Sequence, residues 1–90
     1  QLRRDIAIVV YKNIPVQIIL ADIRQTGGDL LKDCWLFDIY EGDKLPVGKR
    51  SLAFGLIFQD PENTLADEVV NQNVQNVLDV IAKQHNAVLR

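Results

Sequence analysis

The stretch that decides the fold spans residues 36–54 and reads LFDIYEGDKLPVGKRSLAF. Its first part alternates apolar and polar side chains as far as Tyr40, and its last part alternates small and bulky side chains from Ser51. Alternation with a period of two indicates a β-strand, and the polar, glycine-containing segment between the runs is typical of a connecting loop. The stretch therefore predicts two antiparallel strands joined by a loop at residues 41–50.

The sequence on either side of this hairpin predicts the rest of a small α+β domain. After Pro15, which suits the first turn of a helix, apolar side chains recur every three or four residues as far as Ile23. The same spacing returns between Val70 and Ile81, so two amphipathic helices are predicted. β-Branched and apolar residues predict strands at residues 4–10, 31–40, 51–59 and 87–89.

The resulting order is β-α-β-β-α-β, which is the split βαβ or ferredoxin-like arrangement. We therefore predict an α+β fold in which a four-stranded antiparallel sheet carries both helices on one face. The opposite face of the sheet, called the open face below, is left to solvent or to a ligand.

Side chains alternate across a strand, so each strand divides between the core and the open face. The bulky positions of the third strand define its core face and leave small side chains on the open face: Ser51, Ala53 and Gly55. The core positions predicted in the second strand are Trp35, Phe37 and Ile39. The positions that this leaves on the open face are Cys34, Leu36, Asp38 and Tyr40.

Length and composition allow one domain with a single modest core. The chain has 90 residues, a net charge of −2 and one cysteine, so neither an internal disulfide nor a cysteine-based metal cluster is expected. No apolar run is long enough to cross a bilayer. Because the sequence starts at Gln1 without a methionine, we expect residues 1–90 to be one domain of a longer, cytoplasmic chain.

The open face has the chemistry to receive an unpaired RNA base. The ring of Tyr40 offers a stacking surface, Asp38 can accept hydrogen bonds from base amino or imino groups, and Ser51 can donate or accept. The adjoining loop adds cations that can contact phosphates: Lys44, Lys49 and Arg50. Small residues also occur on sheet faces that are only exposed to solvent and bind no ligand. Periodicity alone leaves this alternative open.

Other ferredoxin-like proteins match the residues less well. An RNA-recognition motif would need aromatic side chains on the open face of the third strand, where Ala53 and Gly55 stand instead. An acylphosphatase would need a glycine- and arginine-containing phosphate loop after the first strand, and residues 11–15 contain neither. His85 and Cys34 have no partners that suggest a metal or catalytic site. A regulatory or protein-interaction module that binds a small molecule or another protein remains the alternative.

Four segments of the chain together form a recognisable pattern: RDIA at residues 4–7, LFDIY at 36–40, LPxGKxSLAF at 45–54 and FxDPxxTL at 58–65. They resemble the ferredoxin-fold anticodon-binding domain, and the resemblance covers essentially the whole chain. This domain ends the beta subunit of bacterial phenylalanyl-tRNA synthetase and also closes the single-chain organellar enzyme.

The resemblance implies a binding module without catalytic residues, metal or cofactor of its own. Its partners would be the anticodon stem-loop of tRNA-Phe, the remaining domains of the beta subunit and the catalytic alpha subunit, but neither DNA nor a membrane. The parent enzyme would attach phenylalanine to tRNA with ATP and Mg²⁺ at a distant active site. In the family the first anticodon base, a guanine, stacks on the tyrosine that matches Tyr40, and the positions matching Asp38 and Ser51 contact the same region.

Overall fold

A computed structural model describes all residues from 1 to 90, and it has the predicted order of elements. The elements are β1 (Leu2–Tyr11), α1 (Val16–Gly27), a 3₁₀ turn η1 (Gly28–Leu30), β2 (Leu31–Tyr40), β3 (Lys49–Phe58), α2 (Asp67–His85) and β4 (Val88–Leu89). The boundaries lie within a few residues of those predicted, and the turn η1 is the one additional element. Neither helix is long and apolar enough to span a membrane.

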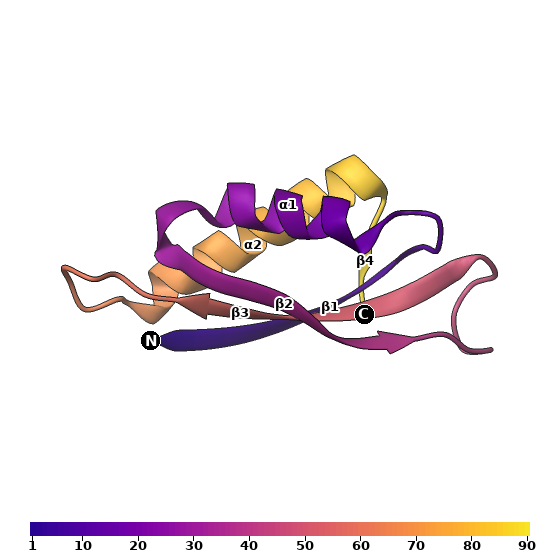
Figure 1. Ribbon diagram of the computed structural model, residues 1–90, viewed down its shortest axis with the longest axis horizontal. Coiled ribbons are helices and arrows are strands. Elements are labelled where there is room, and N and C mark those ends of the chain that lie inside the picture. The colour runs from indigo at the N-terminus through magenta and orange to yellow at the C-terminus, as the bar shows by residue number, and fades with distance from the viewer.

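The four strands form one antiparallel sheet in the order β2-β3-β1-β4. Both helices lie on the same side of this sheet, and no helix covers the other side (Figure 1). This is the ferredoxin-like α+β architecture, so the predicted fold is confirmed. The loop between β2 and β3 and the turn after β3 project from opposite ends of the elongated sheet (Figure 1).

The core fills the space between the helices and the sheet. Its sheet side consists of alternate residues of β1 and β3, and Leu52, Phe54, Leu56 and Phe58 are fully buried, as predicted. Its helix side consists of one stripe from each helix: Ile19 and Ile23 of α1, and Val70, Val77 and Ile81 of α2. Between Ser51 and Gly55 the bulky side chains of β3, Leu52 and Phe54, point to the helices, which leaves only small side chains on the open face.

The faces predicted for the first half of β2 are wrong. Cys34 is buried and Leu36 packs against the core, whereas Phe37 is about half exposed. The cause is a β-bulge: Leu36 pairs with Phe54 and Asp38 pairs with Ala53, so Phe37 has no partner on β3. One extra residue reverses the alternation of the side chains before it, here as far as Asp33, where the pairing is irregular again.

Beyond the bulge the alternation agrees with the prediction. Asp38 and Tyr40 pair with Ala53 and Ser51, which are open-face residues, and Ile39 pairs with the core residue Leu52. Ile39 thus faces the helix side as predicted, but it is about half exposed and does not join the core. Before the bulge, Trp35 pairs with Gly55 and therefore lies on the open face with Phe37. A methyl group added at Gly55 would come within 2.6–2.9 Å of the Trp35 indole, so glycine leaves the space in which that ring lies.

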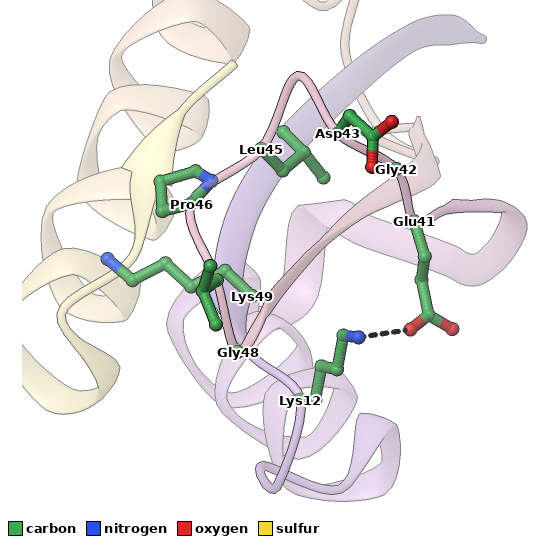
Figure 2. Close-up of a pocket in the computed structure, with 9 residues that line it drawn as sticks. Lys12, Glu41, Gly42, Asp43, Leu45, Pro46, Gly48 and Lys49 are labelled. Atoms are coloured by element: carbon green, nitrogen blue, oxygen red, sulfur yellow. Dashed lines mark ion pairs between the residues drawn. The ribbon is translucent and has the colours of Figure 1, made fainter.

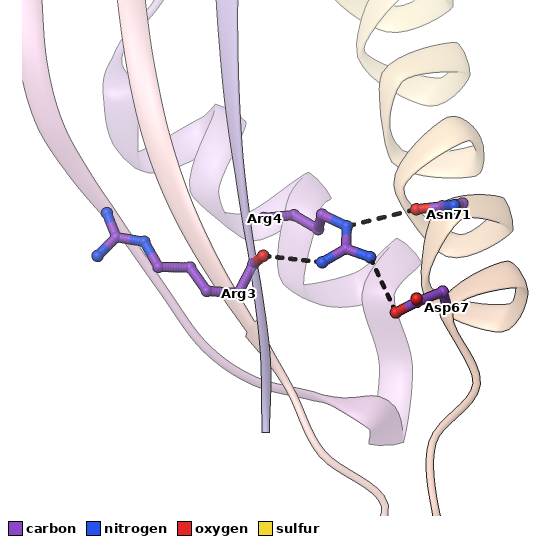
Figure 3. A network of polar contacts seen from close by, with 4 residues as sticks. All are labelled: Arg3, Arg4, Asp67 and Asn71. Carbon is purple, nitrogen blue, oxygen red and sulfur yellow. Dashed lines mark hydrogen bonds and ion pairs between the residues drawn. The ribbon is translucent and has the colours of Figure 1, made fainter.

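Polar contacts attach the helices to each other and to the sheet. His85 in α2 contacts the Asp22 carboxylate of α1 with an Nε2–Oδ2 distance of 2.5 Å, so the histidine joins two helices instead of binding the last carbonyls of its own helix. Arg4 donates to Asn71 and Asp67 at the start of α2, at 3.3 and 3.4 Å. Figure 3 shows Arg4 directed toward α2 and Arg3 directed to the opposite side of β1.

Because the lone cysteine is buried, the fold should lose stability when the pH rises into the alkaline range. Desolvation raises the pKa of the Cys34 thiol from an ordinary value of 9.0 to about 11, although the nearby Arg24 guanidinium opposes the shift. The unfolded chain therefore ionises this thiol first. Its contribution to stability is fully present below pH 9 and is lost as the pH rises toward 11.

We expect the free energy of unfolding to fall more steeply between pH 9 and 11 for the natural chain than for Cys34→Ala, as measured by urea unfolding. Equal slopes would contradict this account.

Candidate nucleic-acid interface

Three of the six residues predicted to bind RNA lie together at one end of the open face. Tyr40 is next to Ser51 across the β2-β3 pair, and Asp38 precedes them by two residues on β2. The floor beside Asp38 consists of Ala53 on β3 and Ala7 on β1, which pair with each other. Because these floor side chains are methyl groups, a flat ligand can approach the sheet closely.

Arg90 completes this group of residues, and the sequence analysis missed it. Its guanidinium lies over the Tyr40 ring, 4.8 Å from the centroid, and its Nη1 donates to the Ser51 Oγ at 3.2 Å. The backbone N–H of Arg90 donates to the carbonyl of Ala7, which holds the residue beside β1. Ser51 is consequently only 2% exposed, so in this conformation Arg90 presents the outermost polar group above it.

The backbones of an acid and a base stand at the two ends of one row across the sheet, and the side chain of the base, Arg90, reaches back over Tyr40. The row runs from Asp38 through Ala53 and Ala7 to Arg90. Three inter-strand spacings separate the two charged residues, or about 14 Å between their backbones. A carboxylate only accepts hydrogen bonds and a guanidinium only donates them. A planar ligand lying on the alanines can therefore be offered acceptors on one side and donors on the other.

The position of the Tyr40 ring depends on Gly42 in the adjoining loop. A methyl group added at Gly42 would come within 2.5 Å of the Tyr40 hydroxyl oxygen and 2.8 Å of the ring carbon that bears it. The loop therefore passes against the phenol end of the ring, and the glycine leaves room for this approach. Together with Arg90, Gly42 restricts where the ring can lie.

The three predicted cations differ in position. Lys49 lies on the open face, with its Nζ 4.6 Å from the centre of the Tyr11 ring, and Lys44 is exposed in the loop. Arg50 pairs with the buried residue Val10 and so faces the helix side, where it donates to the carbonyl of Ile14 at 3.3 Å. The structure therefore does not bring Arg50 together with Tyr40.

A polar cavity of about 480 Å³ lies inside the loop that follows Tyr40. Its charged lining residues are Lys12, Glu41, Asp43 and Lys49, and Lys12 forms an ion pair with Glu41 at 3.0 Å (Figure 2). Two acids and two bases balance one another, so the cavity itself is not an anion site. It does border the open-face site, because Gly42 and Lys49 line it.

The other end of the open face carries an aromatic cluster that the parity prediction had assigned to the core. The guanidinium carbon of Arg3 lies 5.1 Å from the Trp35 ring centroid and 5.8 Å from that of Phe37. Asp5 accepts from the Arg3 Nε at 2.9 Å and holds the guanidinium over the rings. We call these three side chains, Arg3, Trp35 and Phe37, the aromatic patch.

Comparisons with known proteins agree with the fold. Residues 1–90 match the family model described as ferredoxin-fold anticodon binding domain. The chain is 48% identical over 90 residues to the phenylalanine–tRNA ligase beta subunit of Psychrobacter arcticus, and 49% identical over 87 residues to that of Geobacillus kaustophilus. These alignments cover 100% and 97% of the chain but only 11% of either relative. The chain therefore belongs to the family of ferredoxin-fold anticodon-binding domains.

Proposed function

From this family membership we propose that the open face binds the anticodon stem-loop of tRNA-Phe. The observation that supports the proposal is the convergence of Tyr40, Asp38, Ser51 and Arg90 at one end of a face that no helix covers. A partly exposed ring beside small residues suits an unstacked base, which is the form in which single-stranded RNA loops are read.

In the proposed complex an anticodon base stacks on Tyr40. In the free chain the Arg90 guanidinium stacks on this ring. A bound base would take its place and would contact the ring over a larger, apolar surface. The Arg90 guanidinium then moves from the ring to the edge of the base, while Ser51 keeps its position near the site. Such a stacking contact contributes roughly 1–3 kcal/mol to binding.

Hydrogen bonds from the two ends of the alanine row would select the base. Asp38 accepts from a base edge that carries N–H groups, and Arg90 donates to an edge with two adjacent acceptors. Guanine has both kinds of edge, whereas adenine presents one acceptor beside a donor and lacks the pair of adjacent acceptors that suits a guanidinium. Arg90 is therefore proposed as the donor at this site, with Ser51 as the residue that positions it.

The two lysines near the site would attract the phosphate backbone of the RNA but would hardly distinguish one base from another. Lys49 and Lys44 flank the site and are proposed to contact phosphates. Arg50 was predicted to do the same, but its bond to the Ile14 carbonyl favours a role in attaching β3 to the chain before α1. With a net charge of −2, the chain has no excess of cations for phosphate contact, so its affinity should be modest and salt-dependent.

The proposed setting is a larger enzyme, because the chain spans 11% of the length of its curated relatives. We propose that residues 1–90 are one module of a phenylalanine–tRNA ligase beta subunit. The aminoacylation with ATP and Mg²⁺ would take place elsewhere in that enzyme, together with the alpha subunit, in the cytoplasm. The module itself would hold the tRNA and take no part in the chemistry.

A binding experiment tests this function directly. Fluorescence anisotropy should be measured with a labelled anticodon stem-loop of tRNA-Phe, and with the same stem-loop carrying adenine in place of the first anticodon base. We expect the guanine form to bind more tightly, and Arg90→Gln to remove most of this difference. Equal affinity of the natural chain for both stem-loops would contradict the proposed base readout, and no binding at low salt would contradict the function.

A further inference from the structure

We infer that the aromatic patch is a second base-stacking site, with Phe37 as its platform. This inference rests on the proposed function and extends it to a surface that the first site does not use. Phe37 is 49% exposed although it stands in the middle of a ten-residue strand. A single exposed apolar side chain is ordinary, but Phe37 shares the Arg3 guanidinium with Trp35, and a cluster of aromatic side chains on one face is the kind of surface that marks a contact with a ligand or partner.

The β-bulge in β2 places the Phe37 ring on the open face. Without the extra residue, the alternation of β2 would place Phe37 on the side opposite to Asp38. The bulge instead places Phe37 on the open face with its neighbour Asp38 and with Tyr40. β-Bulges are common beside functional sites, where they redirect a side chain.

The spacing along β2 connects the two sites. Three residues separate Phe37 from Tyr40, which corresponds to about 10 Å along a strand. Nucleotides of one unstacked RNA strand can cross this span while they stay on the same sheet face. Two aromatic platforms on neighbouring positions of one sheet are a known way of holding consecutive bases.

The groups around Phe37 favour a nucleotide as the occupant. Arg3 lies close to both rings of the patch and is half exposed, so it can stack on a base or contact a phosphate. Trp35 lies between the Gly55 backbone and Arg3, so it supports the patch from below. Phe37 is the ring with the larger free area. Contacts of this kind tolerate any base, so the second site would add affinity without selecting sequence.

The test compares Phe37→Ala with the natural chain in binding to the anticodon stem-loop. We expect a loss of affinity of about tenfold, the value of one stacked base. Phe37→Tyr should keep the affinity because it keeps a ring, whereas Phe37→Leu should lose it although it stays apolar. Ile18→Ala is the matched control, because Ile18 is similarly exposed, at 47%, but lies on α1 in the helix layer. Circular dichroism of each variant establishes that it is folded.

Trp35 provides an independent signal, because it is the only tryptophan of the chain. A base stacked beside it should quench its fluorescence, and Phe37→Ala should abolish the quenching. If the natural chain binds and Tyr40→Ala weakens binding while Phe37→Ala leaves both affinity and quenching unchanged, the second site is wrong and the proposed function stands. If the natural chain binds no stem-loop, the proposed function fails and the second site fails with it.

Discussion

Replacing Phe54 by alanine is expected to lower the free energy of unfolding by roughly 3–5 kcal/mol. Phe54 is fully buried, and its register partners Ile6 and Leu36 belong to the same apolar layer between sheet and helices. Removing the ring leaves a cavity that this layer can only partly fill. Urea unfolding followed by circular dichroism at 222 nm measures the change.

The matched control is Phe37→Ala, which deletes the same ring from the neighbouring strand but from the open face of the sheet. Because Phe37 is about half exposed and unpaired at the bulge, its loss should cost less than about 1 kcal/mol. The ratio of the two effects therefore tests which faces of the sheet are buried. Equal costs, or a larger cost for Phe37→Ala, would mean that β2 is not bulged as described.

Replacing Tyr40 by alanine is expected to weaken binding of the anticodon stem-loop by roughly 1–3 kcal/mol, the contribution of one stacked base. The ring lies on the open face beside Ser51 and under Arg90, and it takes no part in the core. The fold should therefore remain, with only the contact to Arg90 lost. Isothermal titration calorimetry with the stem-loop measures the change.

Tyr40→Phe is the control for this prediction, since it keeps the stacking ring and removes only the hydroxyl group. It should bind close to the natural level. If both variants lose the same affinity, the hydroxyl and not the ring carries the contact. If Tyr40→Ala binds normally, the base does not stack at this position.

The sequence predicted the fold because its local signals agree with one another. The alternation in β3 is regular from Ser51 to Phe58, and the apolar stripes of the two helices match the layer that they cover. These patterns depend on side-chain spacing alone. The placement of Tyr40, Asp38 and Ser51 on the open face was predicted for the same reason, since all three lie where the register is regular.

The errors have two physical causes. Nothing in the letters CWLFDIY marks the bulge, because both alternations bury apolar residues; only the pairing with β3 decides between them. Arg90 was missed because it follows a strand of only two residues. Its position over Tyr40 depends on how β4 pairs with β1, and this is a long-range contact that no local pattern reports.

The central claim is that the open face, and not the helix layer, binds the anticodon stem-loop. An NMR titration of the ¹⁵N-labelled 90-residue chain with the tRNA-Phe stem-loop at low salt tests it most directly. The amides and side chains to follow are those of Asp38, Tyr40, Ser51, Arg90 and the loop at residues 41–48.

We expect shifts concentrated at these positions and at Phe37, with α1 and α2 unchanged. A stem-loop with a different first anticodon base should shift the loop and the patch but move Asp38 and Arg90 much less. Shifts confined to the helices, or the absence of shifts with a folded chain, would contradict the account and would favour a protein or small-molecule partner for this domain.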